Sequence, residues 1–201
     1  MSYFLKSASP VTRPERHYLQ RFKRREQLPT ASLWRLECGI VRVVTWNDSG
    51  DVIPLGFWGA GSLVGGALVA ADPYEIQALT PVVAERLSHL TPIPEDIFVA
   101  QTRQTAAFVK ILHCRQVEER LLRFFCWLMD QFGQSTPEGA CLPFRLTHQE
   151  LADAIATTRV TVTRTLRQLE AEGYLKWSRT EKVVFYSTLN QSAFPRLSAS
   201  A

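Results

Sequence analysis

Residues 146–177 carry the pattern of two short helices joined by a tight turn, and this stretch constrains the fold more than any other. Thr147 is followed three residues later by Glu150, which is the spacing of a capping box. In such a box the hydroxyl accepts a hydrogen bond from a free amide of the first turn, and the carboxylate accepts one from the amide of the cap residue. Apolar side chains four residues apart then predict a short helix over 149–155.

A second helix is predicted from Arg159 to about Glu172, after the polar break at 156–158. Thr158 can cap its first turn, and Gly173 ends it. Apolar residues at positions i, i+4 and i+7 predict its inward face: Val162, Leu166 and Leu169. The outward face combines cations, hydroxyls and one small apolar side chain, with almost no acid: Arg159, Val160, Thr161, Thr163, Arg164 and Arg167.

This outward face predicts DNA binding, since an ordinary amphipathic helix would present mixed Glu and Lys instead. The strand-like segment 174–185 that follows is typical of the wing of a winged helix. Eight Lys or Arg against five acids over 142–201 give a net charge of +3, out of +4 for the whole chain, which suits a polyanion. A winged helix that docks on a protein is the alternative interpretation. A second basic run, 21–25, is predicted to be a solvated strand or turn, with contact to DNA or a partner as its alternative.

Residues 144–169 resemble the DNA-binding domain of the cyclic-AMP receptor and fumarate-nitrate regulator superfamily. The run TRVTVTR at 158–164 is similar in particular to the cyanobacterial nitrogen-control branch of that superfamily. The resemblance implies an α+β fold with an N-terminal β-roll (a double-stranded β-helix of the cyclic-nucleotide-binding kind), a long dimerisation helix and a C-terminal winged helix-turn-helix. It also implies a homodimeric transcription regulator, an activator, that binds double-stranded DNA and contacts RNA polymerase.

A dimer of such motifs reads two half-sites about 34 Å apart, so we expect a near-palindromic operator. Base contacts are expected from four residues of the second helix: Arg159, Val160, Thr163 and Arg164. Phosphate contacts are expected from Thr147, Gln149, Thr158, Thr161 and Arg167. Arg164 suits a bidentate contact to guanine, and the nitrogen-control resemblance implies GTA/TAC half-sites.

At 201 residues and 46% apolar, the chain can bury the cores of two modest domains. We divide it into a sensor-like β-roll over 1–93, dimerisation and linker helices over 94–133, and a winged helix-turn-helix over 134–201. The first part is strand-like over 33–88. Strands are predicted at 33–46, with a break at Cys38-Gly39, and at 52–58, where the turn cluster 47–51 makes a hairpin.

After the helix breaker at 91–94 the pattern changes to a helix that runs to about residue 132, with a bend near 114–118. Its apolar residues are spread over more than one face. One face would close the β-roll, and the other would pair with the same helix of a second subunit. A single helix buried inside a larger monomer is the alternative.

The sensor part lacks the residues that a cyclic nucleotide needs. In the cyclic-AMP receptor branch a Gly-Glu pair holds the ribose and an Arg-Ser pair takes the phosphate. Here the corner 63–68 has no acid, and 69–78 has no Arg or Lys, while its Asp72 and Glu75 would repel an anion. 2-Oxoglutarate, the effector implied by the nitrogen-control branch, also needs arginines. We therefore expect no cofactor and no tight binding of these effectors; a different ligand, the expression level or a protein partner would regulate the protein.

Other classes of protein find little support. The four histidines lie far apart and the cysteines show no C-x-x-C pair, so no metal site is expected: Cys38, Cys114, Cys126 and Cys141 are predicted to be buried free thiols. No G-x-S-x-G elbow or P-loop is present, so an enzyme is not predicted. No segment could span a bilayer and the N-terminus lacks a signal-peptide core, so we expect a cytoplasmic protein without membrane contact.

Overall fold

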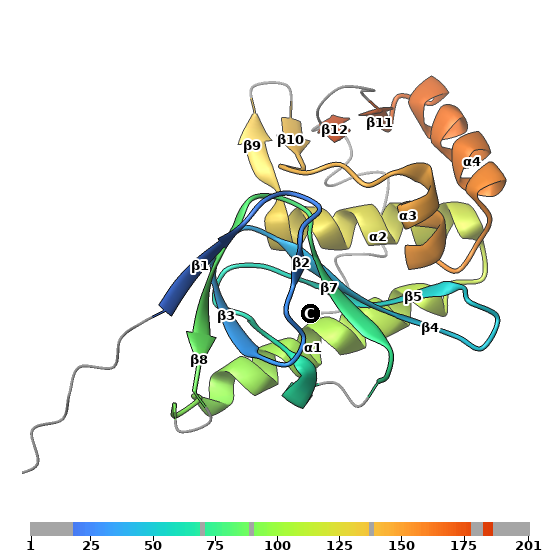
Figure 1. Ribbon diagram of the computed structural model, residues 1–201. Helices are drawn as coiled ribbons and strands as arrows, with labels where there is room; N and C mark the ends of the chain where they lie inside the picture. Colours follow the sequence, from blue (N-terminus) through green and yellow to red (C-terminus); the bar gives the residue numbers. More distant parts are fainter. Residues whose placement is uncertain (1–17, 69–70, 89–90, 137–138, 178–182, 187–201) are drawn as a thin grey trace, which may run out of the picture.

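The computed structural model describes residues 18–68, 71–88, 91–136, 139–177 and 183–186. Two four-stranded antiparallel sheets make up its N-terminal part, in the orders β1-β8-β3-β6 and β2-β7-β4-β5. Their strands are β1 (Tyr18–Phe22), β2 (Gln27–Leu28), β3 (Leu33–Cys38), β4 (Val41–Trp46), β5 (Val52–Trp58), β6 (Leu63–Val64), β7 (Tyr74–Ala78) and β8 (Val82–Leu87), with a short 3-10 helix at Gly66–Leu68. The two sheets curve around each other into a roll (Figure 1).

Apolar side chains on the inner faces of both sheets fill the roll. Trp34 is buried among them, and its indole N–H donates to the carbonyl of Pro29 at 2.9 Å, so its polar atom is satisfied. In strand β4, Val41 and Val43 belong to this core. Because side chains alternate along a strand, Arg42 lies on the opposite face, away from the interior of the roll.

The strands confirm the predicted hairpin and correct the extent of the sheet. β4 pairs with β5 across the turn at 47–51. The break at Cys38-Gly39 separates β3 from β4, which belong to different sheets. The sequence missed β1 and β2, which precede the segment predicted to be strand-like. The basic run 21–25 covers the end of β1 and the turn after it, as predicted.

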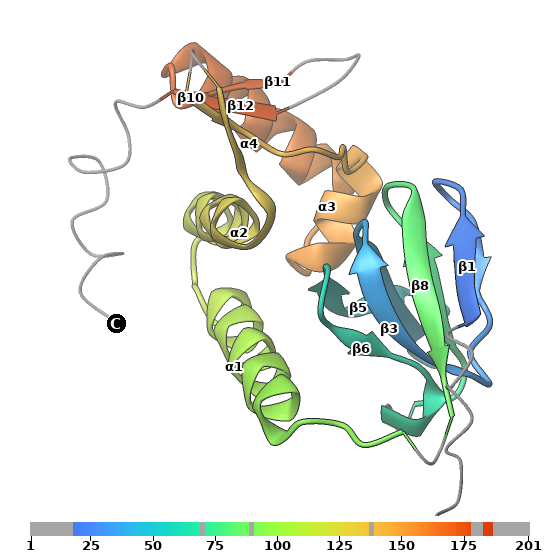
Figure 2. The same ribbon diagram turned by 90° about the vertical axis from the view of Figure 1, so that its left-hand side faces the viewer.

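Two helices follow the roll, α1 (Glu95–Leu112) and α2 (Val117–Phe132), and the predicted bend separates them. Figure 2 shows α1 beside the roll and α2 beyond its end. An aromatic cluster joins the three parts: Phe57 of β5, Phe108 of α1, and Phe124 and Trp127 of α2 have neighbouring ring centroids 5.5–6.2 Å apart. None of the helices in the described part of the chain could cross a membrane.

The C-terminal part contains α3 (His148–Ala154) and α4 (Arg159–Ala171), close to the predicted helices. A small sheet accompanies them in the order β11-β12-β10-β9, built from β9 (Gln134–Thr136), β10 (Gly139–Cys141), β11 (Leu175–Trp177) and β12 (Val183–Tyr186). The sequence did not predict β9 and β10, and residues 178–182 of the predicted wing lie outside the described residues. The predicted fold class, α+β with an N-terminal β-roll and a C-terminal helix-turn-helix, is confirmed.

The thiols are free, as predicted, but the prediction that they are buried is wrong for three of the four. Only Cys141 is buried, whereas Cys38 is exposed and Cys114 and Cys126 are half-buried. Cys38 is the last residue of β3, where the strand gives way to a corner at Gly39 with φ +90°. The side chain therefore lies at the surface of the roll.

Candidate nucleic-acid interface

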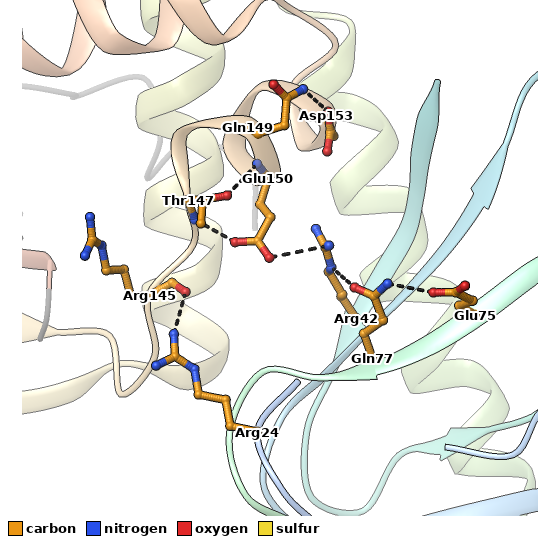
Figure 3. A network of polar contacts seen from close by, with 9 residues as sticks. All are labelled: Arg24, Arg42, Glu75, Gln77, Arg145, Thr147, Gln149, Glu150 and Asp153. Atoms are coloured by element: carbon orange, nitrogen blue, oxygen red, sulfur yellow. Dashed lines mark hydrogen bonds and ion pairs between the residues drawn. The ribbon is translucent and has the colours of Figure 1, made fainter. Parts of the chain in front are cut away.

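The first helix of the motif begins with the predicted capping box. The amide of Glu150 donates to Thr147 Oγ1 at 3.1 Å, and the amide of Thr147 donates to Glu150 Oε2 at 2.6 Å (Figure 3). Two amides that would otherwise lack partners at the start of α3 are thus satisfied. Leu151 and Ile155 are fully buried, which confirms the predicted apolar face.

The turn between the two helices is tight, as predicted, and it contains a left-handed residue that the sequence did not indicate. Ala156 has φ +51°, a left-handed conformation that L side chains rarely adopt. The amide of Thr157 reaches back to the carbonyl of Ala152 at 3.0 Å across this turn. Thr158 then caps α4, as predicted, by accepting from the amide of Thr161 at 3.1 Å. The pattern at 156–158 predicted a polar break, but alanine gave no sign of the left-handed residue.

The second helix divides into the two faces that the sequence predicts. Its inward residues Val162, Leu166 and Leu169 are buried in the apolar core. At its N-terminus Arg159, Val160 and Arg164 are exposed, and Val160 keeps 78% of its surface accessible. A valine so exposed contributes nothing to the core of this chain.

Thr163, the fourth predicted base contact, is held closer to the protein. Its hydroxyl donates to the carbonyl of Arg159 at 2.9 Å and lies 2.8 Å from Nδ1 of His148. Since the hydroxyl hydrogen is already used, it accepts from the imidazole N–H. Thr163 is half-buried on the side of α4 that faces His148, so its methyl group and one hydroxyl lone pair remain for contact with a base.

The residues predicted to contact phosphates surround the same end of the motif. Thr147, Gln149, Thr158 and Arg167 are at least partly exposed, and Thr161 is half-buried. Several of their polar groups also work within the protein: Thr158 and Thr161 share a hydrogen bond of 2.9 Å between their hydroxyls, and Gln149 Nε2 donates to Asp153 Oδ1 at 2.7 Å. No ion pair among the described residues engages the three arginines of α4, Arg159, Arg164 and Arg167. Their charge is available to an external anion.

The structure adds three side chains that sequence reasoning missed: Arg145, His148 and Arg24. Arg145, two residues before the cap of α3, places its guanidinium 5.9 Å from the ring centroid of Trp177 in β11. His148 packs beside the same indole, with ring centroids 5.5 Å apart. Arg24, from the basic run of the β-roll, donates to the carbonyl of Arg145 at 3.4 Å (Figure 3). The only sequence feature that could have indicated these residues is the position of Arg145 next to the capping box.

Burial and the surrounding cations lower the pKa of His148. Desolvation is the largest cause, and the positive charges of Arg145, Arg159 and Arg167 act in the same direction, while Glu170 opposes them. The imidazole is therefore favoured in its neutral form, which suits its hydrogen bond to Thr163. The three arginines lie near enough to one histidine to form a single positive region at this end of the motif.

The chain is similar to known regulators over most of its length. A family described as "Crp-like helix-turn-helix domain" matches residues 119–186. The regulatory protein CysR of Synechococcus elongatus is 36% identical over 177 residues, which cover 86% of this chain and 85% of that protein. The global nitrogen regulator of the same organism is 35% identical over 82 residues, or 41% of this chain and 37% of that protein.

A solved structure shows the same architecture. A transcriptional regulator of the CRP family from Thermus thermophilus superimposes with a TM-score of 0.72 and 26% sequence identity. The match covers 84% of this chain and 92% of that one, so it includes the β-roll, the helices and the helix-turn-helix.

Replacing His148 should change how stability depends on pH. The pKa of His148 is lowered in the folded state, so the unfolded chain binds more protons, and stability falls as pH drops below about 6.5. A His148→Asn variant keeps an N–H donor near Thr163 but does not titrate. We expect its melting temperature to change less between pH 7.5 and 5.5 than that of the wild-type protein, measured by circular dichroism. Equal pH dependence in the two proteins would contradict the role given to this imidazole.

Proposed function

The chain belongs to the Crp/Fnr superfamily of DNA-binding transcription regulators, and we propose that it acts as a homodimer on a near-palindromic operator. The observation that carries the proposal is the outer face of α4. There, three arginines without an ion pair among the described residues accompany the exposed Val160, on a helix packed by its other face. The family resemblance supports activation through contact with RNA polymerase in the cytoplasm.

Reading of the operator would fall mainly to the N-terminal half of α4. Arg164 would direct its guanidinium to the O6 and N7 atoms of a guanine, and Arg159 would contact a base or a phosphate. Val160 has an apolar surface suited to a thymine methyl. Thr163 would add contacts through its methyl group. Thr147, Gln149, Thr158, Thr161 and Arg167 would bind phosphates and set the register.

Replacing Arg164 should relax specificity at one base pair. We expect Arg164→Ala to cost about 1–3 kcal/mol of binding free energy on the selected operator and little on operators changed at that position. Arg167→Ala, one turn of α4 away, is the matched control and should weaken all sequences alike. Selection from random duplexes followed by anisotropy titration measures both. If selection returns no palindrome, sequence-specific binding fails and a protein-docking winged helix takes its place.

Helix α1 supports the dimer because it exposes a partly apolar seam beside its buried face, next to the cavity between α1 and the roll. Phe108 and Ile111 are buried inside the protein, whereas Phe98 and Val109 keep 42% and 46% of their surface accessible. Phe98, Thr102, Thr105 and Val109 follow one another at spacings of 4, 3 and 4, the repeat of a coiled-coil seam. A second copy of α1 would cover this stripe under twofold symmetry.

A charge in the seam should separate the subunits. We expect Phe98→Glu combined with Val109→Glu to give a folded monomer with much weaker operator binding, because the two half-sites are then bound independently. Arg103→Glu, at an exposed position off the seam, controls for added negative charge. Light scattering and operator titration at micromolar concentration give the result. A wild-type monomer at that concentration would refute the dimer.

The cavity between the roll and α1 supports the proposal that the usual effectors are not bound. A cavity of about 620 Å³ lies there, and apolar side chains from β4, β5 and β6 line it on the side of the roll. From α1 it is lined by Phe98, Gln101, Thr102, Thr105 and Ala106, and no Arg or Lys lines it among the described residues. Arg103 and Lys110 are exposed and are not among its lining residues. An anionic ligand would find no countercharge in this cavity.

Calorimetric titration with cyclic AMP, cyclic GMP and 2-oxoglutarate should therefore detect no binding at micromolar concentration. Each of these compounds is an anion, and transfer of its charge into an apolar cavity is unfavourable without a paired cation. Binding that is lost in Arg103→Gln would contradict this, because it would show that an arginine outside the cavity completes the site.

A further inference from the structure

Arg42 is charged and yet nearly buried, with only 9% of its surface exposed. It is not one of the residues proposed to contact DNA. It lies on the outer face of β4, between two valines of the roll core. Its Nε donates to Gln77 Oε1 on the neighbouring strand β7 at 2.8 Å, and Gln77 Nε2 donates to Glu75 Oε2 at 2.7 Å. Its Nη2 lies 3.4 Å from Glu150 Oε1 of α3. Figure 3 shows this row of polar contacts running from the sheet to the helix.

Glu150 therefore has two roles on its two oxygens. One oxygen closes the capping box of α3 by accepting from Thr147, and the other faces Arg42 of the roll. The carboxylate is fixed by the cap at the start of the helix, and the guanidinium is fixed by Gln77. Both charged groups are thus held by other residues on their own side of the contact. The ion pair between them therefore favours one orientation of α3 relative to the sheet.

The neighbours of Arg42 show that the Arg42–Glu150 ion pair belongs to a larger contact surface between the β-roll and the helices. Arg42 and Phe57 are opposite each other in the β4–β5 pairing. Phe57 enters the aromatic cluster with α1 and α2, whereas Arg42 faces α3, which packs beside β5. Apolar packing brings the helix-turn-helix to the roll. The ion pair, together with the hydrogen bond from Arg24 to the carbonyl of Arg145, adds directional contacts to that packing.

Separation of the pair would leave a nearly buried guanidinium with few partners. Nη1 of Arg42 has no hydrogen-bond partner among the described residues, so Gln77 and Glu150 supply the polar contacts that compensate its burial. Leaving a buried charge unpaired is strongly unfavourable. Rotation of α3 away from the sheet would therefore be opposed.

We propose that Arg42 is a positioning residue: through Glu150 it fixes the orientation of the helix-turn-helix on the β-roll, and so fixes the half-site separation that the dimer accepts. The inference rests on the proposed function, because half-site separation has a meaning only for a dimer on a palindrome. In a symmetric dimer, a small rotation of each α4 changes the distance between the two recognition helices. A tightly held unit rejects an operator whose spacer has one base pair more or fewer.

The test compares operators of the selected spacing with operators that have one base pair added to or removed from the spacer. The ratio of their affinities is measured for the wild-type protein, Arg42→Gln, Glu150→Gln and the double variant. Glu150→Gln keeps an oxygen that can accept from Thr147, so it removes the charge and preserves the cap. Arg35→Gln is the matched control, because Arg35 forms its ion pairs with Glu37 and Glu85 inside the roll rather than with α3.

We expect each single variant to lower the spacing discrimination by about threefold or more, and the double variant to lower it no further, as for two residues acting through one contact. Arg35→Gln should keep the wild-type ratio. If Arg42→Gln does not fold, Glu150→Gln decides alone.

Retention of the wild-type ratio in these variants, or losses that add independently, would overturn the inference. A wild-type protein that binds no palindrome would instead refute the proposed function, and this inference with it. The two failures are distinguished by the wild-type titration alone.

Discussion

One apolar core, distinct from the core inside the roll, joins the outer side of the β-roll to the two long helices and the helix-turn-helix, and the aromatic cluster is its junction. Phe57 comes from the roll, and the rings of Phe108, Phe124 and Trp127 come from α1 and α2. The same core continues through α3 and α4 to Leu175 of β11. Because interiors pack to high density, a shift of any one element is felt by its neighbours. The position of the outer face of α4 thus depends on core contacts that lie far from it.

Much of the C-terminal part could be predicted because its signals are local. A capping box, a helix N-cap and an i, i+4, i+7 stripe depend on residues within about two turns of one another. The structure confirms them at Thr147, Thr158 and the buried face of α4. The two-faced pattern of α1 and the bend after it were also visible, since helix periodicity and breakers are properties of a short segment.

The remaining features depend on contacts between residues far apart in the sequence. β1 is an exposed strand whose only buried side chain is Phe22, so it has little apolar pattern, and it is ordered by pairing with β8. Arg42 lies in β4 and Glu150 lies in α3, and no local pattern connects them. The left-handed Ala156 was hidden because glycine, the usual residue for that conformation, is absent. Tertiary structure decides all three.

The folding of the motif also limits how it can read DNA. The sequence suggests that the hydroxyl groups at and after the start of α4 are free to contact DNA, but three of them form hydrogen bonds within the protein. Thr158 caps the helix, Thr161 bonds to Thr158, and Thr163 bonds to His148. Each such bond fixes the start of α4 and reduces the freedom of its side chain to turn towards a base. The guanidinium groups of Arg159, Arg164 and Arg167 and the methyl groups of Val160 remain on the outer face of α4. Specificity would then come from few contacts on a rigid helix, which makes the orientation of that helix on the roll all the more important.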